Sequence, residues 1–262
     1  MQLTLKSSTS FLPVKMIMAE SGLFSILDSV DSTNNYAMAI VHAGLAKHGM
    51  AWFAHEQTAG KGQRGNKWET GKGQNIALSI ILMPAGLKTS QQFEISVAVS
   101  LGCFDFFNDL AGGRVFIKWP NDIYWCDRKA GGILIENVLQ GNKWKYAVAG
   151  IGININQTAF DKEMKNPVSL KEITGKKYNS LDLAEELYKK ILFRVDQLHK
   201  KPFSNLLSEY NNFLYKLNSY TRLKKSSIVF DTLIKGVNEQ GKLLTTDVID
   251  NEFGFGEVEW IM

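Results

Sequence analysis

The sequence has 262 residues, of which 45% are hydrophobic and 11% aromatic, and its formal net charge is +4. This composition supplies a packed core and argues against disorder, and the length allows one large domain or a large domain with a small one. The charge suits small anionic ligands or an acidic protein partner, but it is too weak to indicate a protein that binds duplex nucleic acid.

The sequence lacks the patterns that are typical of zinc sites, membrane spans and secretion signals. The two cysteines, Cys103 and Cys126, form no C-x-x-C pair, and the four histidines form no H-E-x-x-H motif. No run of about eighteen apolar residues could span a membrane. The N-terminus lacks an apolar core followed by a small-residue cleavage site, which predicts a cytoplasmic protein.

The first elements predicted are a strand at residues 24–27 and a helix that follows a cluster of polar residues. Ser32, Thr33 and Asn34 form an N-cap signal, and apolar residues follow at helical spacing, which predicts a helix that reaches Ala46. One capping residue is sufficient for a helix. The remaining polar groups are therefore available to a ligand at the helix N-terminus.

A glycine-rich loop, residues 57–68, links two apolar segments that are predicted to be strands, residues 50–54 and 76–82. Three glycines and three basic residues alternate in it, at Gly60, Lys61, Gly62, Arg64, Gly65 and Lys67. Glycine lets the backbone approach a ligand closely, and backbone N–H groups with cationic side chains suit a phosphate or another anion. The sequence therefore predicts an anion-binding loop between two strands.

The same loop satisfies G-x-G-x-x-G, the dinucleotide-binding pattern. That pattern requires a helix that opens at the third glycine, and no helical period follows Gly65. The Walker pattern G-x-x-x-x-G-K-[ST] is absent. A solvated basic hairpin without a ligand remains an alternative for this stretch alone.

The middle of the chain is predicted to add a helix and three strands. Thr89 and Gln92 have the spacing of a capping box, and the apolar residues after them predict a helix that ends near Gly112. Three strands are predicted next, at residues 114–119, 132–136 and 145–151. Pro120 ends the first strand, and a Gly-Asn turn at residues 141–142 makes the other two a hairpin.

After the hairpin, residues 157–179 are polar and irregular, which predicts a long connection that is functional or mobile. Two amphipathic helices are predicted next, with apolar positions across residues 183–198 and 206–217. From Tyr220 the pattern changes to short strands. This last part is too small to be stable alone, so we expect it to dock on the rest.

Charged and amide groups gather where the strand at residues 114–119 ends. Lys118, Asn121 and Asp122 flank Pro120 there, and ligands commonly bind at strand ends. A simple Pro-Asn-Asp turn explains the same residue types, so both interpretations stay open for this motif alone.

Glycines also accompany polar residues in the two strands of the hairpin. Gly131 and Gly132 follow Lys129, which would lie at the entry to a pocket. Gly150 and Gly152 precede Asn154 in a pattern that suits hydrogen bonding to a flat polar ring. A tight crossing of the sheet would require the same glycines without any ligand.

In order and spacing, these motifs together resemble the biotin protein ligases. The resemblance rests on residues 31–34, 57–68, 118–122, 129–136 and 150–156 and covers most of the chain. It implies an α+β fold in which helices flank a mixed sheet related to class II aminoacyl-tRNA synthetases, followed by a small SH3-like β-barrel. The implied domains are a biotin- and ATP-binding catalytic domain at residues 1–218 and an SH3-like domain at residues 219–262.

The function implied by the resemblance is the attachment of biotin to a lysine of a biotin carboxyl carrier protein, of the acetyl-CoA carboxylase type. ATP and biotin are the implied substrates, Mg²⁺ accompanies the polyphosphate, and biotinyl-5′-AMP is the implied intermediate. Some family members carry an N-terminal DNA-binding unit. Too few residues precede Ser32 for one, so we expect no DNA binding. A homodimer is compatible with the resemblance.

The resemblance also implies roles for individual residues. Those expected to bind biotin are Ser32, Thr33, Asn34, Gln57, Gly60, Lys61, Gly62, Gln63, Gly131 and Gly132. Those expected to bind ATP or the adenylate are Arg64, Trp68, Lys118, Asn121, Lys129 and Asn154. The expected catalytic residues are Lys129, Lys61 and Asp122, and no metal ligands are implied. Residues 158–177 are expected to fold over the adenylate and exclude water.

The sequence departs from the family pattern at Lys61 and Gln63, where arginines are usual. A lipoate-protein ligase would share the fold and the adenylation chemistry, but its arginine pair before a Ser-Gly-Gly-Gly run is absent. A non-catalytic nucleic-acid-binding protein or a biotin-responsive regulator is the alternative of another class. The weak charge and the lack of aromatic platforms argue against nucleic-acid binding.

Overall fold

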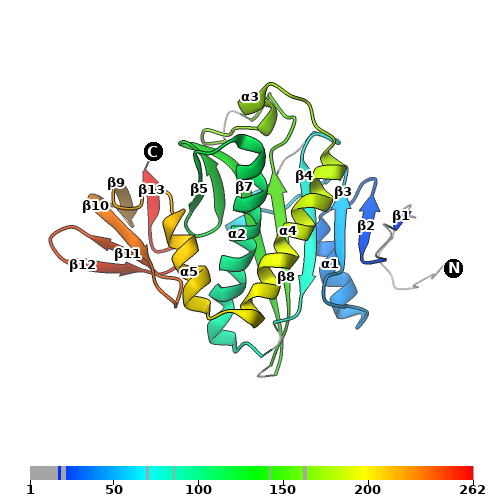
Figure 1. Cartoon of the computed structure of the whole chain (residues 1–262), viewed down its shortest axis with the longest axis horizontal. Coiled ribbons are helices and arrows are strands. Elements are labelled where there is room, and N and C mark those ends of the chain that lie inside the picture. The colour runs from blue at the N-terminus through cyan, green and yellow to red at the C-terminus, as the bar shows by residue number, and fades with distance from the viewer. Residues whose placement is uncertain are drawn as a thin grey trace.

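The computed structural model describes residues 17–18, 22–68, 71–84, 86–141, 143–161 and 164–261. Its main element is an eight-stranded sheet with the order β1-β2-β3-β4-β8-β7-β6-β5 (Figure 1). The strands are β1 (Ile17–Met18), β2 (Phe24–Leu27), β3 (Ala51–Ala54), β4 (Ile76–Leu82), β5 (Val115–Lys118), β6 (Asp122–Trp125), β7 (Arg128–Gln140) and β8 (Lys143–Ile153). Strands β2 and β3 pair in parallel and the other neighbours pair antiparallel, so the sheet is mixed, as the sequence predicts.

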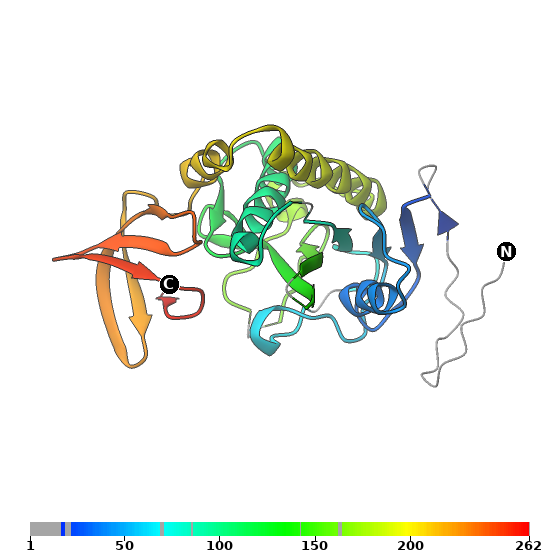
Figure 2. The same cartoon turned by 90° about the horizontal axis from the view of Figure 1, so that it is seen from below.

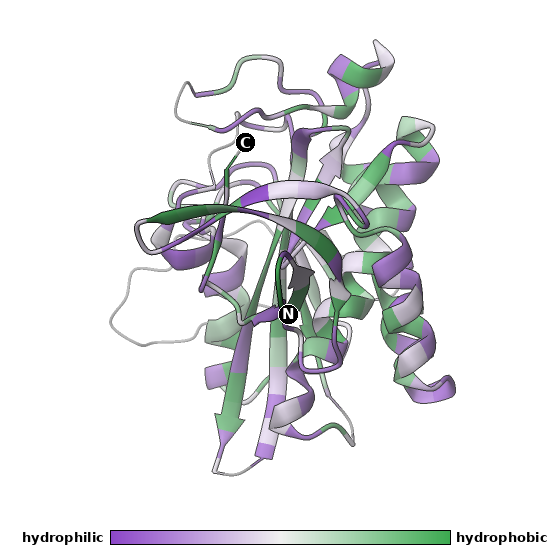
Figure 3. Ribbon diagram, turned by 90° about the vertical axis from the view of Figure 1, so that its left-hand side faces the viewer, coloured by the Kyte–Doolittle hydropathy of each residue, from purple (hydrophilic) through white to green (hydrophobic). Residues whose placement is uncertain are grey.

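Helices cover both faces of this sheet. Helices α2 (Gln92–Ala111), α4 (Ser180–Lys200) and α5 (Phe203–Asn212) pack on one face, and α1 (Thr33–His42) packs on the other (Figures 1 and 2). The strands have two apolar faces for this reason. Phe53 and Ile80 belong to the larger core, while their neighbours Trp52 and Ile81 pack with α1. The helices are amphipathic, with hydrophobic and hydrophilic residues alternating along them (Figure 3).

The strand predictions at residues 24–27 and 76–82 are confirmed, as is the hairpin of β7 and β8, whose strands are longer than predicted. Residue 142 of its predicted turn lies outside the described residues. The prediction that α1 reaches Ala46 is wrong. The helix ends at His42 because Gly44 takes a left-handed φ of 71° and its N–H binds the Val41 carbonyl.

Three other boundary predictions are corrected. The capping box at Thr89 is displaced by one residue, since the backbone N–H of Lys88 donates to Gln91 Oε1 at 2.9 Å. Helix α5 ends at Asn212, before the apolar positions that suggested residue 217. The connection at residues 157–179 is not wholly irregular, because it contains α3 (Leu170–Thr174), which a capping box between Ser169 and Glu172 begins.

The C-terminal part forms a separate antiparallel sheet with the order β12-β11-β10-β9-β13, at one end of the molecule (Figure 2). Its strands are β9 (Tyr220–Lys225), β10 (Ile228–Val237), β11 (Leu243–Thr246), β12 (Asp250–Phe253) and β13 (Glu259–Ile261). This arrangement is consistent with the predicted SH3-like unit. The Trp119 indole donates to the Gly241 carbonyl at 2.9 Å, and the Asn211 amide binds both backbone groups of Val237. The two sheets are therefore docked, as expected.

No helix among the described residues has the length and apolar character needed to span a lipid bilayer.

Candidate functional site

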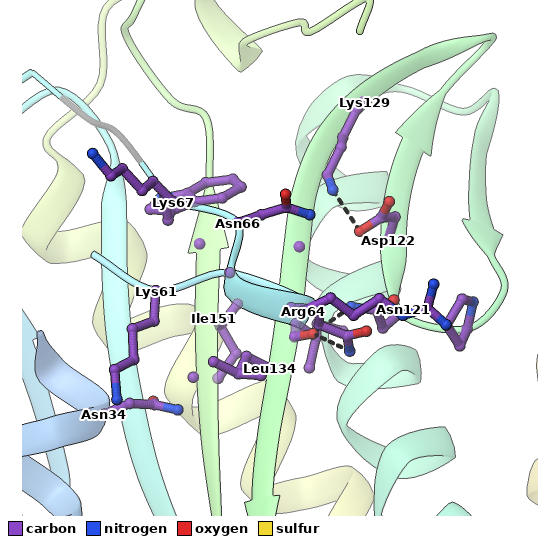
Figure 4. Close-up of a pocket in the computed structure, with 18 of the residues that line it drawn as sticks. Asn34, Lys61, Arg64, Asn66, Lys67, Asn121, Asp122, Lys129, Leu134 and Ile151 are labelled. Carbon is purple, nitrogen blue, oxygen red and sulfur yellow. Dashed lines mark hydrogen bonds and ion pairs between the residues drawn. The ribbon is translucent and has the colours of Figure 1, made fainter. Parts of the chain in front are cut away.

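A cavity of about 270 Å³ lies on the sheet face that carries α1 (Figure 4). Most of the predicted site residues line it: Ser32, Thr33, Asn34, Gln57, Lys61, Gly62, Gln63, Arg64, Trp68, Asn121, Asp122, Lys129 and Gly132. Four predicted residues do not line it, namely Gly60, Gly131, Lys118 and Asn154. The cavity is also lined by residues that the sequence did not assign, including Gly150 and Gly152 of β8 and the C-terminal residues Phe255, Gly256, Val258 and Trp260.

The polar residues at the start of α1 do not cap the helix. Ser32 is the N-cap residue, yet its side chain makes no cap hydrogen bond. Gln57 Oε1 instead accepts from the Thr33 backbone N–H at 2.8 Å and from Thr33 Oγ1 at 3.1 Å. The capping interpretation is therefore wrong for Ser32, whose side chain accepts no N–H of the first turn, and the N–H of the first helical residue is bound by Gln57 of the glycine-rich loop.

A chain of hydrogen bonds continues from Thr33 into the sheet. Ser79 Oγ lies 2.8 Å from Thr33 Oγ1 and 2.5 Å from Asn34 Oδ1. The Asn34 amide donates to Glu136 Oε2 at 2.8 Å. Thr33, Asn34 and Ser79 are each at least 96% buried, so this network forms a fixed polar floor at one end of the cavity. Ser79 was missed, although a serine within the apolar run of β4 was a visible signal.

The glycine-rich loop folds into a short hairpin that lies over the sheet. Lys61 pairs with Lys67 in an antiparallel bridge, and the Trp68 N–H donates to the Gly60 carbonyl at 2.9 Å. At its tip a 3₁₀ turn (Gln63–Gly65) holds Arg64 in the left-handed region, with φ 54°. The loop is thus a hairpin, as the alternative interpretation expected. Its position over the cavity shows that it is not a purely solvated turn.

Two glycines of β8 leave the space that this arrangement needs. A Cβ at Gly150 would lie 2.2 Å from Asn34 Oδ1, and a Cβ at Gly152 would lie 2.2 Å from the Trp68 ring. Both positions face the cavity beside Leu134 and Gly132 of β7, their partners across the ladder. Glycine is required there because a side chain and a tryptophan ring rest directly on the strand.

Gly150→Ala is expected to lower the free energy of unfolding by about 1–3 kcal/mol, because the added methyl group must displace the Asn34 side chain. Gly132→Ala is the matched control, since a Cβ there would meet only contacts of 3.5 Å or more. Chemical denaturation of the two variants measures the difference. Equal unfolding free energies would contradict the close packing of Asn34 on Gly150.

Lys129 and Asp122 form an ion pair at the opposite end of the cavity, 2.7 Å from Nζ to Oδ1 (Figure 4). Asp122 pairs with Gly132 across β6 and β7, but the register shifts so that Tyr124 pairs with Lys129. The extra residue in β7, Ala130, turns Lys129 to the face that Asp122 occupies. A regular ladder would have placed the two side chains on opposite faces.

Asn121 is held between these two ends. Its side-chain amide donates to the Ile133 backbone carbonyl at 2.5 Å. Its backbone carbonyl accepts from the Ile133 backbone N–H at 2.9 Å. The Gln63 amide donates to the same Ile133 carbonyl at 3.2 Å, which ties the tip of the glycine-rich loop to β7. Figure 4 shows Lys61 extending toward Asn34, whereas Lys129 points to Asp122. Cations therefore approach the cavity from both of its ends.

Asn154 lies beneath the cavity rather than on its wall. Its side chain is almost fully buried, and its amide donates to the Val168 carbonyl at 3.2 Å. Val168 and Leu170 are themselves buried. The backbone N–H of Lys129 donates to the carbonyl of Asn166, just before them, at 2.9 Å. The end of the predicted lid is thus anchored to the sheet, and none of the described residues of this segment lines the cavity.

Lys118 is 9% exposed and lies between aromatic rings. Its Nζ is 4.7 Å from the centre of the Tyr124 ring and 5.5 Å from that of Trp260, and it donates to the Tyr124 hydroxyl at 3.1 Å. Burial lowers the pKa of Lys118 to about 8, a shift that neighbouring Asp122 opposes and Lys129 reinforces. The contact of Lys118 with Trp260 of β13 joins the end of β5 to the C-terminal sheet.

The stability of the protein should rise with pH because of Lys118. Below pH 8 both the folded and the unfolded chain carry this proton, so the cost of burying the charge is present in full. Between pH 8 and 10.5 the unfolded chain binds more protons, so the free energy of unfolding rises, by roughly 3 kcal/mol. Denaturation of wild type and Lys118→Met across this range isolates the effect. Parallel curves for the two proteins would refute it.

Among the described residues, no three Asp, Glu, His or Cys side chains gather closely enough to hold a metal ion. Asp122 is the one carboxylate among the described residues that line the cavity.

Comparison with known proteins identifies relatives of this chain. Residues 26–154 match the model of the Biotin/lipoate A/B protein ligase family. The "Bifunctional ligase/repressor BirA" of Escherichia coli (strain K12) is 28% identical over 232 residues, which cover 86% of this chain and 70% of the relative. The "Biotin--[acetyl-CoA-carboxylase] ligase" of Paracoccus denitrificans is 34% identical over 157 residues, which cover 57% of this chain and 63% of the relative.

The solved structures include a similar fold with both small molecules bound. The biotin protein ligase from Aquifex aeolicus in complex with biotin and ATP superposes with a TM-score of 0.76 at 25% identity. The match covers 90% of this chain and 97% of that one. The similarity extends over both sheets, beyond the residues that the family model matches.

Proposed function

We propose that this chain, whose residues 26–154 match the Biotin/lipoate A/B protein ligase family, is a biotin–protein ligase that uses ATP to join biotin to a lysine of an acceptor protein. One observation carries the proposal. A single cavity contains a buried polar network at one end and a partly exposed ion pair at the other. Such a cavity suits a molecule with a polar ring, an apolar chain and a reacting carboxylate.

The polar network suits the ureido ring of biotin, which offers two N–H donors and one carbonyl acceptor. Thr33 and Gln57 already hydrogen-bond to each other and can exchange these bonds for bonds to the ring. Leu134 and the Trp68 ring line the cavity and supply apolar surface for the valeryl chain. The biotin carboxylate would then reach toward Lys129.

In the first chemical step, a biotin carboxylate oxygen attacks the α-phosphorus of ATP and pyrophosphate leaves. Two anions must approach each other, so the barrier depends on positioned positive charge. Lys129 is the candidate to bridge them. Lys61 extends toward Asn34 at the other end of the cavity, so it would have to turn with the glycine-rich loop to reach them. The product, biotinyl-5′-AMP, is a mixed anhydride. In the second step, the ε-amine of the acceptor lysine attacks its acyl carbon and AMP leaves.

Mg²⁺ belongs to this proposal as the partner of the ATP phosphates. The described lining residues provide one carboxylate, Asp122, which is paired with Lys129. Mg²⁺ tolerates such a site because it retains waters and takes phosphate oxygens as ligands. When bound, it would neutralise charge on the departing pyrophosphate. A biotin carboxyl carrier protein of the acetyl-CoA carboxylase type is the proposed acceptor, and the name of the Paracoccus relative specifies that carboxylase.

Pyrophosphate release from ATP tests the proposal. We expect release that depends on biotin and continues in multiple turnovers when an unmodified carrier domain is added. The carrier should gain the mass of one biotinyl group. The same assay is run with lipoate in place of biotin, because the family includes lipoate ligases. Release with lipoate and none with biotin would replace the proposed substrate, and release with neither would refute the activity.

A further inference from the structure

Arg64 at the tip of the glycine-rich loop does not turn toward the polar floor of the cavity. Its Cζ lies 5.0 Å from the centre of the Phe255 ring, in the turn between β12 and β13 of the C-terminal sheet. Both residues line the cavity. A cation at this distance over an aromatic face is attracted to it. The loop and the C-terminal sheet therefore meet at the mouth of the cavity, although about 190 residues separate these two residues in the sequence.

The backbone on both sides is shaped for this contact. Arg64 holds a left-handed conformation, φ 54° and ψ 37°, which is uncommon for a residue with a side chain. Gly256 has φ 87°, and a Cβ there would lie 1.4 Å from Arg64 Nη2. Only glycine at position 256 lets the guanidinium lie where it does. A strained residue and a required glycine at one contact indicate that the contact is specific.

The contact leaves the hydrogen-bonding groups of Arg64 available. A cation–π contact does not consume the N–H groups of the guanidinium, which can still donate to oxygen atoms. None of the hydrogen bonds and ion pairs found among the described residues involves these N–H groups. They lie at the end of the cavity that the C-terminal residues close.

We infer that Phe255 is a positioning residue for ATP: it holds Arg64 at the mouth of the cavity, so that the glycine-rich loop and the C-terminal sheet close over the phosphates together. This inference rests on the proposed function for the identity of its ligand. It extends that function by giving the C-terminal sheet a part in nucleotide binding. Arg64 supplies the charge, and Phe255 acts through Arg64 alone.

Limited proteolysis tests the contact without any substrate. Trypsin cleaves after Lys61, Arg64 and Lys67 when the loop opens, so cleavage reports how firmly Phe255 holds it. We expect Phe255→Ala to speed this cleavage about two- to fivefold, the equivalent of one exposed cation–π contact. Phe255→Tyr should restore the wild-type rate, whereas Phe255→Leu, which is apolar but has no ring, should not.

The matched control is Val248→Ala. Val248 is 96% exposed and lies in the preceding turn of the same sheet, between β11 and β12. Truncating it removes an exposed apolar side chain and should leave the cleavage rate unchanged. Equal rates for wild type, Phe255→Ala and Val248→Ala would overturn the inference.

Kinetics with ATP then test the positioning role. At saturating biotin, Phe255→Ala should raise the KM for ATP about two- to fivefold, with a smaller change in kcat and none in the KM for biotin. Arg64→Ala should raise the KM for ATP at least as much. The double variant should be no worse than Arg64→Ala, because Phe255 acts through Arg64. Additive losses would overturn the inference.

Failure of the proposed function and failure of this inference about Phe255 give different experimental results. If the wild type released no pyrophosphate with biotin, the proposed function would fail while the proteolysis result would still decide the contact. If the wild type were an active biotin ligase but Phe255→Ala matched it in cleavage and in the KM for ATP, the inference alone would fail.

Discussion

Replacing Lys129 by alanine is expected to slow biotin-dependent pyrophosphate release about a hundredfold or more. Lys129 is the one residue that the ladder irregularity in β7 turns toward both the cavity and Asp122. If it bridges the biotin carboxylate and the α-phosphate, its loss removes charge stabilisation worth several kcal/mol from the adenylation step. The affinity for biotin alone should fall much less, since the ureido end of the cavity does not involve Lys129.

Stopped-flow or quenched-flow measurement of the first turnover separates adenylation from transfer to the acceptor. Lys143→Ala is the control, because Lys143 is an exposed lysine on β8 outside the cavity. The Lys129–Asp122 pair is partly exposed, so its loss should change the free energy of unfolding by only about 1 kcal/mol or less. A folded Lys129→Ala protein that forms the adenylate at the wild-type rate would remove Lys129 from the proposed mechanism.

The sequence predicts those helices and strands whose pattern of apolar and polar residues lies within the element itself. The apolar run at residues 76–82 became β4 with the predicted bounds, because helices cover both faces of the sheet there and every residue is buried. The end of α1 was predictable in principle from Gly44, whose left-handed conformation outweighs the apolar residues after it. Helix α3 was hidden, because five residues carry too little periodicity.

The candidate site was predictable where motifs end strands or interrupt them, as at Asp122 and in the glycine-rich loop. Two features could not be read from the sequence. The shift that turns Lys129 toward Asp122 depends on how β6 and β7 pair, and no residue type marks it. Phe255 and Trp260 reach the cavity only because the second sheet docks on the first, and docking is set by contacts between distant residues.

A chain that ends at Ser219 is expected to lose both its activity and a large part of its stability. Trp119 and Tyr215 are 2% and 5% exposed, and the C-terminal sheet covers them through Gly241 and Trp260. Uncovering large apolar side chains costs roughly 1.5–3 kcal/mol each, which is a large share of the stability of an ordinary domain. The wall formed by Phe255 and Trp260 would be lost as well.

Loss of activity in the truncated chain could follow from unfolding alone, so a full-length variant must accompany it. Trp260→Ala keeps the C-terminal sheet but removes one indole from the cavity wall and from the face of Lys118. Circular dichroism and chemical denaturation report folding, and pyrophosphate release reports activity. We expect Trp260→Ala to remain folded and to turn over more slowly. A truncated chain that matched the full-length protein in both measurements would show that the docked sheet supports neither the core nor the cavity.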